Sequence, residues 1–280
     1  MKSSEPTGRA VLLACVMSIA LTGCEKHDSN ITNSASTPNA PAPASVDVAQ
    51  LVTRYRALDD SRDSILKMRA RIEGQDGGPP EVSMTVYRKR TNEGGKEMLI
   101  EFTAPAQERD RSAIVLTTPQ GDTEGIRYIQ SGDNFVSAKG AMNEDSLFGM
   151  TMQELEDGQP EKYDFKLIGE ETVGSTPAYR IEGKLKSGAE SKFPRLVMLL
   201  SKENNVALVS EFYDSRNELV RRLSVERAEQ VNGHWTRMLW RVDNPARQKK
   251  IEFETLEAKY DQNLSDSIFT RENLKKISKR

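Results

Sequence analysis

The chain has few of the residues on which most metal and catalytic sites depend. Its 280 residues include only two cysteines and two histidines, and a net charge of −2 leaves no excess of basic residues. Zinc sites and iron–sulfur clusters draw on several cysteine or histidine ligands, and nucleic-acid binding needs a basic surface. We therefore expect no metal or organic cofactor and no nucleic-acid partner.

Long apolar runs are also scarce, and the run at the N-terminus is too short to span a bilayer as a helix. Ala10–Leu21 follows the basic residues Lys2 and Arg9, whereas a spanning helix needs about 20 apolar residues. A run of this length is typical of a secretory signal. The tetrapeptide Leu21–Cys24 that ends it resembles the lipobox of bacterial lipoproteins, in which the cysteine is acylated.

We predict that residues 1–23 are a lipoprotein signal peptide and that Cys24 is lipidated. Several acyl chains anchor a protein stably, because each buried CH₂ contributes about 0.8 kcal/mol. Glu25 stands where an Asp would mark retention in the inner membrane. The predicted location is the outer membrane, with a lipid anchor and the protein facing the periplasm. A conventional signal with an incidental cysteine is the alternative.

Residues 24–45 have the composition of a flexible tether. Ser, Thr, Asn, Pro and Ala dominate residues 25–45, and such a segment has too little apolar surface to offset the entropy of ordering. We therefore divide the chain into a signal peptide (1–23), an acylated tether (24–45) and a single domain (46–280).

Apolar periodicity in the domain predicts one helix followed by strands. Val48, Leu51, Val52 and Tyr55 have helical spacing, and the later segments alternate with a period of two between turn signals. The strand candidates are residues 82–86, 98–102, 111–117, 125–130, 164–170, 177–186, 193–200, 206–213, 219–228, 234–242 and 249–256. We predict a mainly β fold, with a strongly curved antiparallel sheet of about ten or eleven strands. Residues 143–157 are expected to cross the sheet as short helical turns.

The alternation places apolar side chains of many strands on one face. A single helix covers too little of such a face, so a cleft for a hydrophobic ligand is predicted there. Strand parity selects the candidate lining residues Val86, Ile100, Phe102, Leu116, Met198, Leu208, Phe212, Met238 and Trp240. A register error of one residue would turn a whole segment outward. The alternative is that the helix and residues 143–157 fill the face as an ordinary core.

Catalytic motifs are absent from the sequence. His234 is the only histidine after residue 45, it follows the Asn232–Gly233 turn, and no G-x-S-x-G sequence accompanies it. We predict a structural role for His234 and a protein that is not an enzyme. A hydrolase that uses paired carboxylates in the cleft, and a non-catalytic adaptor subunit of an envelope complex with a filled cleft, are the alternatives.

Several stretches, in their order and spacing, resemble the outer-membrane lipoprotein-sorting family, which includes LolA and LolB. They are Met98–Pro105, Ser112–Leu116, Phe148–Asp157, Val197–Asp214, Gly233–Asn244 and Asp266–Thr270. The resemblance implies an unclosed half-barrel with a leading helix and short helices over its concave face. It also implies a lipid, acyl-chain or acylated-protein ligand, a role in lipid or lipoprotein sorting or transport, and an envelope carrier or transporter as a partner.

The sequence departs from the family pattern at two points. Residues 143–157 lack the Asp-Phe-x-Tyr motif that is usual in the family. No residue matches the arginine that holds a lid closed over the family's cavity. A cycle of cargo exchange is therefore not carried over to this chain. The predicted lipid anchor is similar to that of LolB rather than to the freely diffusing LolA.

Overall fold

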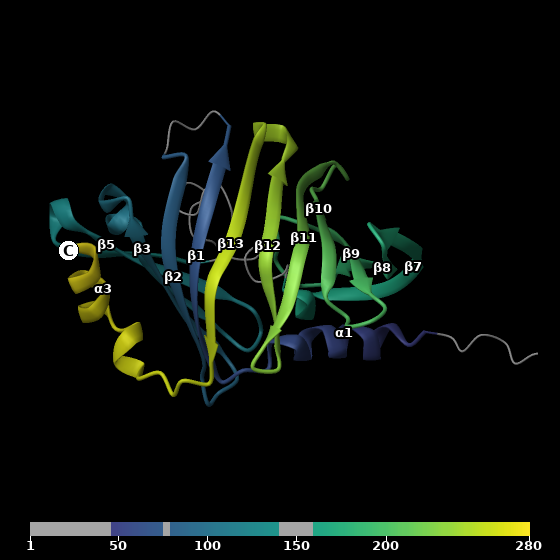
Figure 1. Ribbon diagram of the computed structural model, residues 1–280, viewed down its shortest axis with the longest axis horizontal. Helices are drawn as coiled ribbons and strands as arrows, with labels where there is room; N and C mark the ends of the chain where they lie inside the picture. The colour runs from purple at the N-terminus through teal and green to yellow at the C-terminus, as the bar shows by residue number, and fades with distance from the viewer. Residues whose placement is uncertain (1–45, 75–78, 140–158) are drawn as a thin grey trace, which may run out of the picture. The chain divides into compact units, whose positions relative to one another are not determined.

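A computed structural model describes residues 46–74, 79–139 and 159–280, and residues 45–280 form one compact unit. The predictions for the signal peptide, Cys24, the tether and residues 143–157 lie outside the described residues. Thirteen strands form one antiparallel sheet (Figure 1). The strands are β1 (Asp63–Glu73), β2 (Glu81–Arg90), β3 (Lys96–Ala104), β4 (Ala113–Thr117), β5 (Thr123–Ile129), β6 (Asn134–Lys139), β7 (Tyr163–Val173), β8 (Thr176–Leu185), β9 (Arg195–Ser201), β10 (Ala207–Tyr213), β11 (Leu219–Val231), β12 (His234–Asn244) and β13 (Lys249–Tyr260).

The sheet is open, and its order is β6-β5-β4-β3-β2-β1-β13-β12-β11-β10-β9-β8-β7. Neighbouring strands are consecutive in the chain except for β1 and β13, which pair from Ser64–Tyr260 to Glu73–Lys250. The turn between β4 and β5 nevertheless approaches the segment that leads into β7, the edge strand of the other half of the sheet. Lys162 Nζ in η5 (Pro160–Lys162), just before β7, lies 3.9 Å from Asp122 Oδ1 in the turn after β4. The sheet is therefore strongly curved without being closed.

The predicted mainly β fold and open antiparallel sheet are confirmed, but the predicted strand number is too low. The sequence prediction omitted β1 and β6. In β1, Lys67, Arg69 and Arg71 alternate with buried apolar residues, and these charges obscured the alternation. β6 is a short edge strand that pairs only with β5.

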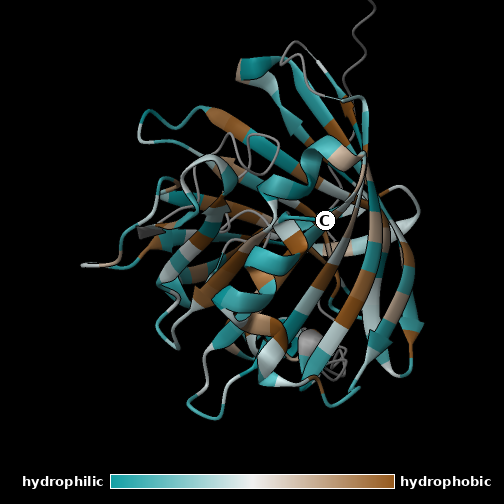
Figure 2. Cartoon of the chain, turned by 90° about the vertical axis from the view of Figure 1, so that its left-hand side faces the viewer, coloured by the Kyte–Doolittle hydropathy of each residue, from teal (hydrophilic) through white to brown (hydrophobic). Residues whose placement is uncertain are grey.

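The main apolar core lies on one face of the sheet and extends across it from β4 to β7. The α-helix α1 (Val48–Arg56) adds Leu51 and Tyr55 to it. Asp47 caps this helix, because its Oδ1 accepts hydrogen bonds from the backbone N–H groups of Ala49 (3.0 Å) and Gln50 (3.2 Å). Figure 2 shows apolar and polar residues alternating along the strands, as expected when one face of each strand is buried.

A second apolar core lies on the opposite face, under α3 (Arg271–Ser278). Leu274 and Ile277 of α3 pack with Leu99, Ile114 and Tyr128 from β3, β4 and β5. Figure 2 shows α3, at the end marked C, in front of these strands. The expectation that the short helices cover the concave face is therefore wrong for α3. Its own apolar side chains cover apolar residues of the other face.

Charged side chains on the outer face are arranged in ion pairs across neighbouring strands. Arg69 of β1 lies 2.5 Å from Glu254 of β13, and Arg71 lies 2.8 Å from Glu252. Arg241 of β12 lies 2.8 Å from the same Glu252. Opposite charges side by side on adjacent strands stabilise their pairing.

Candidate functional site

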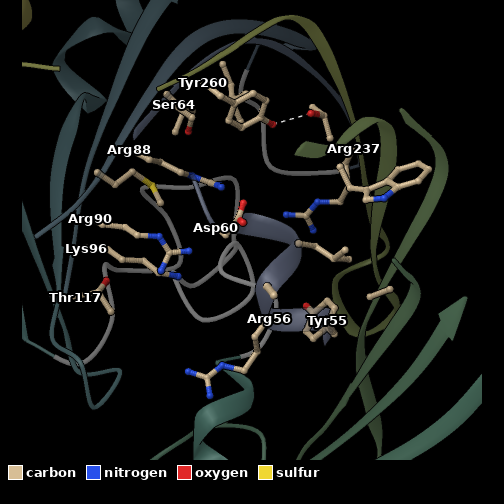
Figure 3. A pocket seen from close by; sticks show the side chains of 18 of the residues that line it. Tyr55, Arg56, Asp60, Ser64, Arg88, Arg90, Lys96, Thr117, Arg237 and Tyr260 are labelled. Carbon is tan, nitrogen blue, oxygen red and sulfur yellow. Dashed lines mark hydrogen bonds between the residues drawn. The ribbon is translucent and has the colours of Figure 1, made fainter. Parts of the chain in front are cut away.

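A cavity of about 610 Å³ lies between α1, the following turn η1 (Ala57–Asp59) and the concave face of the sheet. Figure 3 shows it from close by, with α1 beside the curved strands. Its apolar wall comes mainly from β1, β2, β3, β12 and β13. The large apolar residues of this wall are Tyr55, Leu58, Leu66, Met68, Met84, Val86, Met98, Ile100, Trp240 and Phe253. Cavities of about 300–1,000 Å³ with mostly apolar walls are typical of small-molecule sites.

The position of α1 accounts for the cavity that the described residues form. The helix packs against β7 and buries Leu51 and Tyr55 in the core. One short helix cannot also cover the half of the face that β1–β3, β12 and β13 form. This half of the face is the wall of the cavity.

Both tryptophans of the chain, Trp235 and Trp240, line the cavity. The Trp240 ring stacks on Phe253, with the centroids 4.1 Å apart and an angle of 12° between the rings. The guanidinium of Arg237 lies 4.8 Å from the centre of the Trp240 ring. A ligand in the cavity would therefore change the surroundings of both indole rings.

Five basic side chains line the cavity. Arg56, Arg88, Arg90, Lys96 and Arg237 all line it (Figure 3). The carboxylates of Asp60 and Glu161 line it as well. Among the described residues, the cavity thus combines a largely apolar wall with five cations and two carboxylates.

His234 lies beside the cavity at the start of β12. Its Nδ1 is 3.1 Å from Asp60 Oδ1, and its Nε2 is 3.3 Å from Asp261 Oδ2. Its ring lies 4.6 Å from that of Tyr260. The backbone N–H of Arg62 lowers the pKa of Asp261, and His234 lowers it further. These contacts join the turn after α1 to the end of β13, which fits the structural role predicted for His234.

The predicted lining residues fall into three groups. Val86, Ile100 and Trp240 line the cavity. The structure places another three in the main core on the same face, where they do not reach the cavity; these are Phe102, Met198 and Phe212.

The remaining three candidates do not lie on the cavity wall. Leu116 packs in the core under α3, because Val115 and Thr117 face the concave side. Leu208 packs with Leu199 and Val209 in a small cluster of the other face. Met238 of β12 does not line the cavity either. The parity prediction for Leu116, Leu208 and Met238 was therefore wrong.

Irregular strand pairing explains two of these errors. In β10 the register shifts between Ala207 and Val209, so Leu208 is the extra residue of a bulge. In β12, Arg237 pairs with Ala228 and Leu239 with Arg227, so Met238 is left out of the register and Arg237 lines the cavity. A bulge inserts one residue and reverses the parity beyond it.

The sequence prediction also missed the basic residues of the cavity. The alternation that selects Val86 places Arg88 and Arg90 on the same face, and the one that selects Ile100 places Lys96 there. The alternation therefore indicated the face of these three residues. It did not predict that they line a cavity, because charged residues at a strand end are usually solvated. Leu66 and Met68 were missed together with β1.

Two kinds of feature are absent from the described ranges. No group of three or more His, Cys, Asp or Glu side chains within residues 46–74, 79–139 and 159–280 is placed to hold a metal ion. No helix in these ranges is both long enough and apolar enough to cross a membrane.

Comparison with solved structures identifies three similar folds. A DUF1329 family protein from Desulfovibrio piger has 25% identity and a TM-score of 0.72, over 80% of this chain and 96% of that one. A Vibrio parahaemolyticus domain named as an outer membrane lipoprotein-sorting protein has 18% identity and a TM-score of 0.68, over 81% and 97%. The LolA superfamily protein NE2245 from Nitrosomonas europaea has 15% identity and a TM-score of 0.64, over 82% and 100%.

The fold resemblance predicted from the sequence is thus confirmed, since the chain shares the LolA-like fold. None of the curated proteins matches this chain. A family model described as "Uncharacterized protein" matches residues 94–276, which is about two thirds of the sequence. The chain therefore belongs to the family that this model describes, and it has a LolA-like fold.

Proposed function

We propose that the protein binds a hydrophobic ligand, such as a lipid or a protein-linked acyl chain, in the cavity beside α1. The observation that carries the proposal is the apolar cavity of about 610 Å³ on the concave face. The name of the similar Vibrio parahaemolyticus domain refers to lipoprotein sorting. Burial of an acyl chain of about 300 Å² at about 25 cal/mol per Å² contributes roughly 7 kcal/mol before ordering costs. Micromolar affinity is the expected range.

We also propose that this binding takes place at the bacterial outer membrane, on a protein anchored through Cys24. The motif Leu21–Cys24 and the residue Glu25 support this part of the proposal. Mass spectrometry of the mature N-terminus tests it. An unmodified Cys24, or cleavage at another bond, would remove the anchor and leave the ligand proposal standing.

The test of ligand binding uses the chain from residue 25 onward, which keeps the whole compact unit. Native mass spectrometry should detect a bound lipid after mild purification, and added fatty acids should change the tryptophan emission, because both tryptophans line the cavity. If neither result is obtained, the adaptor hypothesis replaces this proposal.

We further propose that the ligand leaves the cavity chemically unchanged. The competing hydrolase hypothesis would use Asp60 and Glu161, the carboxylates that line the cavity. Incubation with acyl esters, followed by chromatography of the products, distinguishes the binding hypothesis from the hydrolase hypothesis. Turnover by the unaltered chain that is lost in Asp60→Asn or Glu161→Gln would show that the protein is an enzyme.

A further inference from the structure

Three basic side chains lie close together on the cavity face of β2 and β3. Arg88 and Arg90 follow Met84 and Val86 on β2 with the same parity, and Arg90 pairs directly with Lys96 on β3. Figure 3 shows all three projecting into the cavity. Like charges directly opposite each other on adjacent strands destabilise the pairing. The arrangement therefore costs stability unless something neutralises it.

Within the described part of the chain, no carboxylate pairs with these cations. The Nε of Arg88 is buried and has no hydrogen-bond partner among the described residues. Arg90 Nε donates to the backbone carbonyl of Ser61 at 2.9 Å, and Lys96 has no ion pair with any described residue. A buried donor without an acceptor is unfavourable by about 1–3 kcal/mol, and more when it is charged.

The outer face of the same sheet shows the opposite pattern. There, Arg69, Arg71 and Arg241 each have a glutamate partner on a neighbouring strand. Arg88, Arg90 and Lys96 thus differ from these three arginines, each of which has a carboxylate partner. Arg56 and Arg237 add two more cations to the wall, while Asp60 and Glu161 supply its only carboxylates among the described residues.

We propose that the ligand of this cavity is an anionic amphiphile, whose phosphate or carboxylate is held by Arg88 and Lys96, with Arg90 beside them. Its acyl chain lies against Met84, Val86 and the apolar residues beyond them. This inference rests on the proposed function and adds the chemical class of the ligand. A guanidinium binds phosphate or carboxylate oxygens through two parallel hydrogen bonds, and an ammonium adds a point charge.

The experiment compares two ligands that differ only in the anionic group. Monolauroyl glycerol is neutral, and monolauroyl glycerol phosphate carries the same chain with a phosphate. Binding to the chain from residue 25 onward is followed by tryptophan emission. Because a hydrogen bond to a charged group contributes about 1.5–3 kcal/mol, the phosphate form should bind at least about tenfold more tightly. The preference should shrink at high salt, because ions screen the partly exposed cations.

Variants assign the preference to the named residues. Arg88→Met and Lys96→Met should each reduce the preference about tenfold and leave the affinity for the neutral ligand unchanged, which also shows that the variant is folded. Arg88→Lys should keep part of the preference. Lys184→Met removes an exposed cation of β8 that is not on the cavity wall, and it should have no effect.

The possible outcomes separate the two proposals. If neither ligand binds, the proposed function fails. If both bind with equal affinity, or if Lys184→Met lowers the preference as much as Arg88→Met, the hydrophobic site stands and the anionic class is wrong. Inorganic phosphate alone is the third ligand. If it competes as strongly as the acylated phosphate, the basic cluster is a site for free phosphate and the amphiphile is refuted.

Discussion

The length of a bound acyl chain should control its affinity in a graded way. The wall beside α1 is apolar over β1–β3, β12 and β13, so each methylene added inside the cavity leaves water for an apolar surface. At about 0.8 kcal/mol per CH₂, each added methylene should tighten binding about fourfold. Two methylenes, as between decanoate and dodecanoate, should tighten it about fifteenfold. The gain should stop when the cavity is full.

The assay is a titration of the chain from residue 25 onward with saturated fatty acids of ten to sixteen carbons. Intrinsic fluorescence reports directly on the cavity, because Trp235 and Trp240 are the only tryptophans and both line it. Concentrations stay below the critical micelle concentration of each fatty acid. The slope of log Kd against chain length is the measured quantity.

A cavity-filling variant tests whether the fatty acid binds in this cavity. Ala228 of β11 lines the cavity, and in Ala228→Phe the added ring would displace about three methylenes of the ligand and weaken binding about sixtyfold. Ala246→Phe adds the same ring at an exposed position in η6 (Pro245–Arg247) and should leave binding unchanged. Equal affinities along the whole series, or an unchanged affinity in Ala228→Phe, would refute binding in this cavity.

Three further predictions concern stability and are checked by denaturant unfolding. Buried Asp63 accepts hydrogen bonds from two backbone N–H groups after β13, so Asp63→Ala should cost about 3 kcal/mol; a loss below 0.5 kcal/mol would contradict this. Lys166 and then Arg195 lower the pKa of Glu182 to about 2, so Glu182→Gln should cost about 1 kcal/mol at pH 7. Because the folded pKa is depressed, that difference should disappear as the pH falls from 4.5 towards 2, and a difference independent of pH would contradict it. Leu274→Ala should cost about 2–5 kcal/mol, since this side chain of α3 is fully buried against the sheet; unchanged stability would show that α3 is dispensable.

The sequence determines the class of the fold and the composition of its two faces. Alternation over Val82–Val86 and Met98–Phe102 predicts strands with one buried face, and both segments are strands with that face in the main core. The same alternation carries Arg88 and Lys96 to that face. Alternation is a property of neighbouring residues, so it can be read without knowledge of the rest of the chain.

Only the tertiary structure decides which of these residues reach the cavity. Leu208 and Met238 follow the expected alternation in sequence, yet irregular pairing with β9 and β11 alters their positions. Among the described residues, the position of α1 against β7 leaves one half of the concave face without a helix packed on it. The position of a bulge depends on the neighbouring strand, and the position of a helix depends on the strands against which it packs. Both partners are distant in the sequence, so the local pattern of apolar residues does not determine these positions. For the same reason, the convergence of Arg56, Arg88 and Arg237 from a helix and two strands on one cavity is visible only in the folded chain.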